Sequence, residues 1–176
     1  MQTIKLLGAA LICAWILGFA PPVLAADSTD LSVGLKTLPL LTEKMSGAVV
    51  VAVVFDPAKP NSKAEAESIK AMIDSGMEPP GGIKLTATLV SSNEGHKMAG
   101  AKIVYIAQGS CSDAVAATAT AGGMLTISTD IDCVKAGKCI IGVVSKPNIE
   151  IYYSKAASDA AKIGFSQAFS MLVKQV

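Results

Sequence analysis

Hydrophobic residues along this chain fall into short runs that are separated by turn-forming residues. The run Ala48–Phe55 is continuous, apolar and rich in valine, which predicts a strand buried on both faces, as in an α/β sheet. Ile83–Val90 alternates apolar and polar residues instead, which predicts a half-exposed strand near an edge of the sheet. Two further strands are expected at Ala101–Ala107 and Met124–Ser128.

Helical patterns lie before and between these strands. Ser62 and Glu65 have the spacing of a capping box, which predicts a helix start with the Ser62 hydroxyl accepting a backbone amide. A short helix is expected at Asp113–Ala121, and a closing helix from Ser154 to about Lys174. Four leucines recur at intervals of three or four residues, which predicts a helical lid over the core: Leu31, Leu35, Leu38 and Leu41.

The end of the chain predicts a hairpin. The apolar run Cys139–Val144 and the alternating run Ile149–Tyr153 are joined by Lys146-Pro147-Asn148, a turn sequence between two strands. The earlier strand–helix–strand order predicts parallel pairing. We therefore expect an α/β fold with a single mixed, mostly parallel sheet flanked by helices, a C-terminal hairpin and a closing helix. This domain spans residues 35–176, after a loose segment at 26–34.

Residues 1–25 have the features of a secretory signal peptide. Lys5 supplies the positive charge, Leu6–Ala20 is apolar, and the small residues before Ala26 fit a cleavage site. The apolar run is shorter than the ~20 residues that a membrane-spanning helix needs. Cleavage between Ala25 and Ala26 is therefore expected, and the mature chain is expected in the periplasm.

Composition narrows the range of partners. Only 16% of the residues are charged, compared with about 25% in an average domain. The formal net charge is +1, and all 15 basic residues are lysine. Arginine is the usual bidentate ligand of phosphate and guanine. A neutral chain without arginine is a poor candidate for direct binding of nucleic acid or a cyclic dinucleotide.

Three cysteines remain after removal of the leader. An exported chain meets an oxidising environment in which disulfides persist. Cys133 and Cys139 bracket five residues and are the natural pair, which leaves Cys111 as a candidate free thiol. The competing interpretation is a zinc site with His96 as the fourth ligand. The Cys133–Cys139 spacing is wider than zinc sites usually have, so we expect a disulfide and no bound metal.

Few residues suggest catalysis. Asp56 closes the first buried strand, where ligands of open α/β sheets bind, and it is a weak ligand-binding candidate beside its interpretation as an Asp-Pro turn opener. His96, the only histidine, can be paired on paper with Ser110 or Cys111, but no G-x-S-x-G elbow is present. The glycine pairs lack dinucleotide-binding or P-loop spacing. We therefore expect no catalytic residue, no cofactor and no enzymatic activity.

From about Leu35 to Val176 the chain resembles the YfiR/HmsC-like family. The segments that carry the resemblance are AVVVAVVFDP, AGAKIVYIAQG, GGMLTISTDIDCVKAGKCIIGV and NIEIYYSKAASDAAKIGFSQAFSMLVK. The resemblance implies a periplasmic regulator that binds the periplasmic part of a membrane-bound diguanylate cyclase and holds it inactive. Cyclic-di-GMP signalling and biofilm formation would then be under its control. The family pattern includes an additional disulfide, for which Cys111 has no obvious mate here.

Partners follow from the same resemblance. It implies contact with an inner-membrane signalling protein, with an outer-membrane OmpA-like protein as a second candidate, and a homodimer is a further candidate assembly. The alternative function is a periplasmic small-ligand-binding module, because the first strand, Asp56 and the following helix look like half of a solute-binding lobe. Removing 25 residues from 176 leaves 151, which is too short for a complete two-lobed binder.

Overall fold

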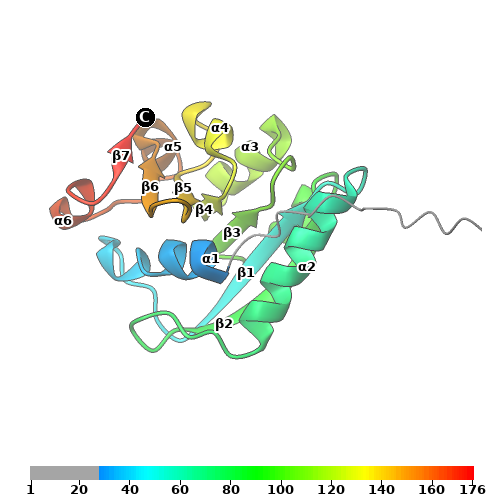
Figure 1. The fold of residues 1–176 in the computed structure, drawn as a ribbon, viewed down its shortest axis with the longest axis horizontal. Coiled ribbons are helices and arrows are strands. Elements are labelled where there is room, and N and C mark those ends of the chain that lie inside the picture. Colours follow the sequence, from blue (N-terminus) through cyan, green and yellow to red (C-terminus); the bar gives the residue numbers. More distant parts are fainter. Residues whose placement is uncertain (1–27) are drawn as a thin grey trace, which may run out of the picture.

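The computed structural model describes residues 28–176, which form one seven-stranded sheet with helices on both faces (Figure 1). The predicted cleavage site at Ala25 and Ala26 lies outside the described residues. The strands are β1 (Ala48–Phe55), β2 (Lys84–Ser91), β3 (Ile103–Ile106), β4 (Leu125–Ser128), β5 (Ile141–Val144), β6 (Glu150–Tyr153) and β7 (Lys174–Gln175). The helices are α1 (Ser28–Leu35), η1 (Leu38–Leu40), α2 (Pro60–Asp74), η2 (Gly95–Met98), α3 (Asp113–Ala121), α4 (Ile131–Lys135), α5 (Lys155–Ala160) and α6 (Gln167–Ser170).

The sheet is mixed and mostly parallel, as the sequence predicted. Its strand order is β2-β1-β3-β4-β5-β6-β7. Strands β1 to β5 pair in parallel with their neighbours. The hairpin of β5 and β6 is antiparallel, and β7 returns parallel to β6. The predicted edge position of β2 is confirmed, because it lies at one end of this order.

Two hydrophobic layers enclose the sheet. Val51 and Val53 of β1 contact the layer that includes residues of α1, α2 and α6, whereas Ala52 and Val54 contact the layer under α3 and α4. All four are buried, as expected for a strand covered on both faces. Val50 differs and is 40% exposed.

The amino-terminal segment is more ordered than predicted. We expected residues 26–34 to be loose, but residues from Ser28 onward form α1. Leu31 and Leu35 of this helix are buried in the core, as are Leu38 and Leu41 beyond it. The leucine spacing therefore predicted correctly that this segment covers the core. The start of the helix was predicted too late because residues 26–32 are mostly polar.

The start of α2 also differs from the prediction. The helix begins at Pro60, whose fixed φ and missing amide suit the first helical turn. Ser62 is consequently inside the helix, and its Oγ accepts a hydrogen bond from the Asp56 amide at 3.0 Å. Glu65 points into the protein and is 3% exposed, so these two residues do not form the expected capping box.

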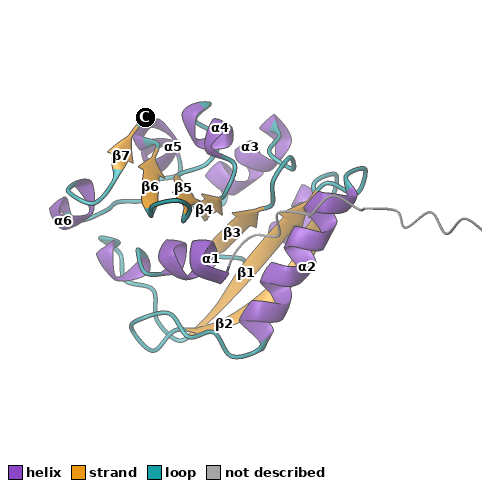
Figure 2. Cartoon of the chain, in the orientation of Figure 1, coloured by secondary structure: helices purple, strands orange, loops and turns teal. Residues whose placement is uncertain are grey.

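The prediction of one closing helix from Ser154 to about Lys174 is also wrong. Helix α5 ends at Ala160, and a loop leads to the separate helix α6 and to β7 (Figure 2). This loop pairs with the segment after η1, because the Thr42 amide donates to Gly164 O at 2.8 Å and the Ser166 amide donates to Leu40 O at 2.8 Å. A Cβ at position 164 would lie 2.9 Å from Thr42 Oγ1. Glycine permits this close pairing, which interrupts the helix.

Candidate functional site

The carboxyl ends of β1, β3 and β4 form the place where an open α/β sheet usually binds ligands. From β1 the chain passes through α2 to β2 on one side, and it then crosses to β3 on the other side. This reversal is the topological switch point. Asp56 and Thr129 directly follow β1 and β4, and Gln108 lies two residues beyond the end of β3.

The buried Glu65 side chain of α2 connects the segments of this region by hydrogen bonds. Its Oε1 accepts hydrogen bonds from Tyr105 Oη at 2.8 Å and from Thr129 Oγ1 at 3.2 Å. Its Oε2 accepts from the Gln108 amide at 2.9 Å. The buried carboxylate thus ties α2 to β3 and to the loops after β3 and β4. Sequence reasoning missed this role, although a tyrosine inside an apolar strand signals a buried partner for its hydroxyl.

In this network Glu65 accepts three hydrogen bonds, and Tyr105 is a donor. Burial raises the pKa of Tyr105 well above its usual range, and the adjacent Glu65 carboxylate raises it further. The phenol therefore remains a protonated donor at neutral pH. Among the described residues, every buried side-chain nitrogen or oxygen has a hydrogen-bond partner.

Asp56 opens the turn after β1. Its Oδ1 accepts from the Ala58 amide at 3.0 Å, and its Oδ2 lies 3.3 Å from Lys59 Nζ. Lys59 Nζ also donates to Gly109 O at 2.7 Å, across the switch point. These contacts agree with an Asp-Pro turn opener. A ligand-binding role for Asp56 stays a prediction.

The three cysteines meet near the same edge of the sheet but on its other face. Cys111 follows β3, Cys133 lies in α4 and Cys139 precedes β5. Their sulfur atoms all lie within 4.8 Å of one another, and the Cα atom of Cys133 lies 6.0 Å from that of Cys111 and 5.5 Å from that of Cys139, both within the range that disulfides usually span. The predicted Cys133–Cys139 pairing is therefore one of two that the geometry allows, and Cys111 is not isolated.

The surrounding backbone holds the cysteines in place. Next to Cys111, the buried Ser110 Oγ lies 2.7 Å from Ala107 O and 3.1 Å from Val54 O. Asp130 caps α4 and accepts from the Cys133 amide at 3.4 Å, and the Cys139 amide donates to Cys133 O at 3.2 Å. The three sulfur atoms are thus presented by anchored segments.

His96 is not brought to the cysteines. It lies in η2, is exposed and lines a separate surface cavity with Thr118 and Met124. The only group of three or more potential metal-ligating residues in the described part of the chain consists of cysteines alone. The structure therefore does not support a zinc site with His96 as the fourth ligand. It also does not support a catalytic pair of His96 with Ser110 or Cys111.

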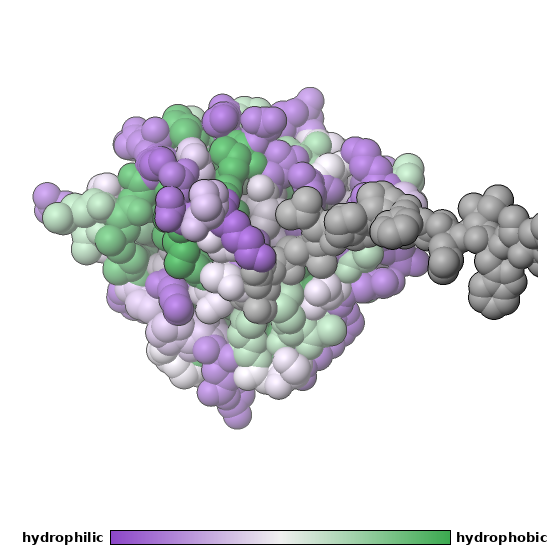
Figure 3. All heavy atoms as spheres, in the orientation of Figure 1, coloured by the Kyte–Doolittle hydropathy of each residue, from purple (hydrophilic) through white to green (hydrophobic). Residues whose placement is uncertain are grey.

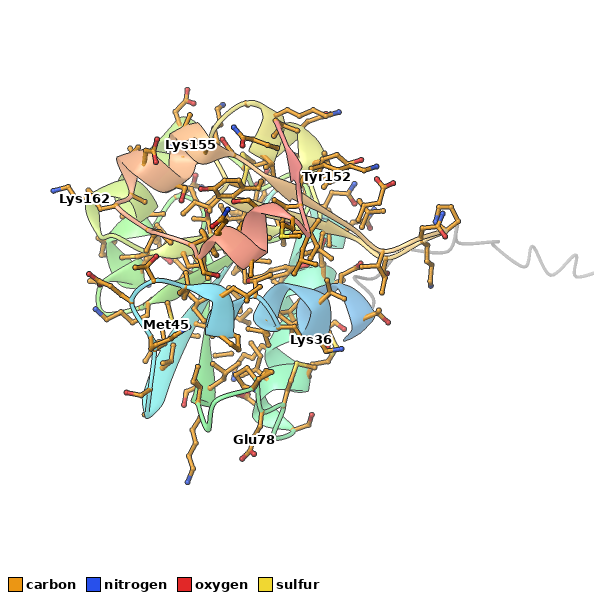
Figure 4. The ribbon with its side chains drawn as sticks, turned by 90° about the vertical axis from the view of Figure 1, so that its left-hand side faces the viewer. Lys36, Met45, Glu78, Tyr152, Lys155 and Lys162 are labelled. Atoms are coloured by element: carbon orange, nitrogen blue, oxygen red, sulfur yellow. A yellow bond between two sulfur atoms is a disulfide. The ribbon has the colours of Figure 1, made fainter. Side chains whose placement is uncertain are left out.

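An apolar face surrounds the end of the chain. It consists of Met171, Leu172 and Val176, which are 84%, 62% and 44% exposed, and we call it the C-terminal face. Figure 3 shows apolar residues gathered on the left of the view, around α6 and the last strands, and Figure 4 looks onto this side. Beneath it, the rings of Phe165 and Phe169 stack with centroids 4.0 Å apart.

A surface cavity of about 340 Å³ lies at the opposite end of the strands from the switch point. Its lining includes Ala48 at the start of β1 and three lysines, Lys44, Lys102 and Lys162. This volume is within the range of about 300–1,000 Å³ that is usual for small-ligand sites. Figure 4 shows Lys162 at the margin of the molecule, pointing outward.

Among residues 28–176 there is no helix with the length and apolar character required to cross a membrane. The fold defines the class of protein as a mixed, mostly parallel α/β domain.

Comparison with known proteins supports this class at the level of the fold. Neither a protein-family model nor a curated protein matches the sequence. An ABC domain from Streptococcus pneumoniae, crystallised in complex with L-tryptophan, has a TM-score of 0.60 and 13% identity over 84% of this chain. A conserved domain protein from Vibrio cholerae has a TM-score of 0.57 and 14% identity over 88% of this chain. This chain spans 60% of the length of each.

Proposed function

We propose that this protein is an exported, non-enzymatic regulator that contacts the periplasmic part of a membrane-bound diguanylate cyclase and represses it. The identity of the partner rests on the resemblance to the YfiR/HmsC-like family. The main observation in favour of a protein-binding role over a catalytic one is the C-terminal face. Here Met171 and Leu172 expose most of their side-chain surface.

The C-terminal face has the properties of a docking surface. Adjacent exposed apolar residues are costly to leave in water, and larger apolar patches mark interaction sites. The Leu172 amide donates to Phe169 O at 2.9 Å and the Val176 amide donates to Tyr153 O at 3.0 Å, so an ordered backbone presents these side chains. Exposed charges nearby are paired, as in Lys174–Glu150 at 2.6 Å. Binding should therefore rely on apolar contact and depend weakly on salt.

The polar groups favour a non-enzymatic role. Glu65 acts only as an acceptor for three donors, and the Asp56 carboxylate is engaged within its own turn. A regulator needs no reacting group. It represses an enzyme by binding the inactive conformation more tightly than the active one, and the repression is limited by that difference in affinity.

The decisive experiment combines a docking variant with a matched control. Replacing Met171 and Leu172 together by Asp should abolish co-purification of the membrane cyclase and raise cyclic-di-GMP to the level of the gene deletion. The Thr88→Asp variant, with its substitution on the distant edge strand β2, should behave as wild type. A leaderless form should fail to complement the deletion.

A different result would favour the alternative function. If deletion leaves the nucleotide level unchanged and no membrane protein co-purifies, the regulator proposal fails and a small-ligand-binding module becomes the better one. The surface cavity is lined by three lysines and one carboxylate, Glu43, and this excess of positive charge favours anionic ligands for such a module. One structural neighbour holds L-tryptophan. Thermal shift assays with amino acids and small carboxylates then test that alternative.

A further inference from the structure

We propose that Cys111, Cys133 and Cys139 form an intramolecular thiol–disulfide exchange site, in which Cys133 moves its disulfide bond between the other two cysteines. The sulfur atoms of the three cysteines all lie within 4.8 Å of one another, so Cys133 has two neighbouring cysteines with which it can form a disulfide. A sulfur in a disulfide bonds only one other sulfur, so the two pairings are alternative states of one chain. Each state has one disulfide and one thiol.

The backbone accommodates either state. The Cα atoms are 5.5 Å apart for Cys133 and Cys139, and 6.0 Å apart for Cys111 and Cys133. Disulfides usually span Cα separations of about 4.4–6.8 Å, so neither pairing requires the anchored segments to move. An ion pair of 2.8 Å between Asp113 and Lys138 also links the segment after Cys111 to the segment before Cys139.

The exchange is balanced without an external oxidant. The Cys111 thiol loses its proton, and the resulting thiolate attacks Cys133 Sγ. The Cys111–Cys133 bond forms while the Cys133–Cys139 bond breaks, and Cys139 leaves as a thiolate that takes up a proton. One disulfide and one thiol are present before and after, so no sulfur is oxidised or reduced overall.

The two states differ in the thiol that they offer. With Cys133 bound to Cys139, the thiol is on Cys111, which is partly exposed. With Cys133 bound to Cys111, the thiol is on Cys139, which has no exposed surface. Because access limits thiol reactivity, a small disulfide or a disulfide of a partner protein would exchange with the Cys111 thiolate of the first state, releasing one of its own sulfurs as a thiolate, and would not react with the second state. Cys111 is thus a modification site whose availability the exchange controls.

Proteolysis after lysine separates the two states. Cleavage at Lys102, Lys135 and Lys138 leaves Cys111 and Cys133 in one peptide and Cys139 at the start of another. The Cys133–Cys139 state therefore gives two linked peptides, whereas the Cys111–Cys133 state gives an internal disulfide. Cleavage at Met124 between Cys111 and Cys133 identifies any Cys111–Cys139 bond.

The experiment uses mature wild-type protein equilibrated at pH 8, quenched with acid and mapped by mass spectrometry. Both linkages are expected. Prolonged alkylation of the native protein with iodoacetamide should then convert every chain to the Cys133–Cys139 state with one label on Cys111, because labelling removes that thiol from the exchange. The Cys111→Ser and Cys139→Ser variants should each form the one remaining disulfide and serve as folding controls.

Three outcomes would overturn the proposal. The first is a single linkage in equilibrated wild-type protein, and the second is two linkages whose ratio does not change during alkylation. The third is three reduced thiols with stoichiometric zinc or copper by elemental analysis, which would make the cluster a thiolate metal site.

Discussion

At the scale of single residues, Glu65 is the side chain whose environment differs most from its local sequence context. Its spacing from Ser62 is that of a capping box, yet it enters the core and accepts the Tyr105 hydroxyl. A buried carboxylate is tolerated only when hydrogen bonds replace its lost hydration. Three donors from separate segments supply those bonds here.

Replacing Tyr105 by Phe tests this network. The change removes one donor to a buried carboxylate and should lower the free energy of unfolding by about 1–3 kcal/mol, measured by urea denaturation at pH 7. Tyr152→Phe is the matched control, because Tyr152 Oη donates to the more exposed Glu150 and its loss should cost less. Equal effects of the two changes would contradict the proposed importance of Glu65.

The same tyrosine predicts a dependence on alkaline pH. Its pKa is raised in the folded protein, first by burial and then by Glu65, so the folded state holds the proton more tightly than the unfolded state does. The resulting stabilisation is complete below about pH 10 and is lost as pH rises toward the folded pKa. Between pH 8 and 11, wild type should lose more stability than Tyr105→Phe, and parallel curves would show that Tyr105 does not contribute.

At the scale of elements, β7 is a two-residue strand beside β6. One contact between them is the ion pair of Lys174 with Glu150, whose carboxylate is titratable. A hydrogen bond from Lys174 lowers the pKa of Glu150, and one from Tyr152 lowers it further. A lowered folded pKa gives stability that is present above the unfolded value of about 4.3 and is lost as pH falls through the folded value.

Acidification should therefore loosen β7 before it unfolds the sheet. Hydrogen exchange at the Val176 amide, which donates to Tyr153 O, should accelerate below about pH 4 relative to amides in β5. Glu150→Gln should already show the faster exchange at pH 7. Asp159→Asn, which breaks only the exposed pair with Lys155, should leave the Val176 amide unchanged. Uniform protection in acid would contradict this prediction.

At the scale of the whole molecule, introducing a charged side chain should destabilise the protein at the buried centre of the sheet and have little effect at its exposed edge. Val51 is 1% exposed, so Val51→Asp would bury an unpaired carboxylate at a cost of several kcal/mol and should prevent folding. Thr88 on β2 is exposed, so Thr88→Asp should be nearly silent. Circular dichroism and thermal denaturation of both variants decide this, and equal destabilisation would show that the assigned strand facing is wrong.

The whole molecule also determines where chemistry can occur. The switch point lies between β1 and β3 and is filled by the Glu65 network, while the cysteines meet on the opposite face beneath α3 and α4. The C-terminal face lies at the end of the sheet where the chain finishes. Partner contact and thiol exchange are thus assigned to separate surfaces and can be tested independently.

The sequence by itself determined strands β1 to β6, the mixed sheet with its hairpin, and the closeness of Cys133 to Cys139, whereas it predicted a helix where the chain ends in β7. These features depend on local periodicity and short spacing, which report burial directly. Only the tertiary structure decided the partners of Glu65, the third cysteine of the cluster and the interruption of the closing helix. Tyr105 is 40 residues from Glu65, and Cys111 is 22 residues from Cys133. Contacts over such separations depend on how strands and loops are arranged in space, and no local pattern records that arrangement.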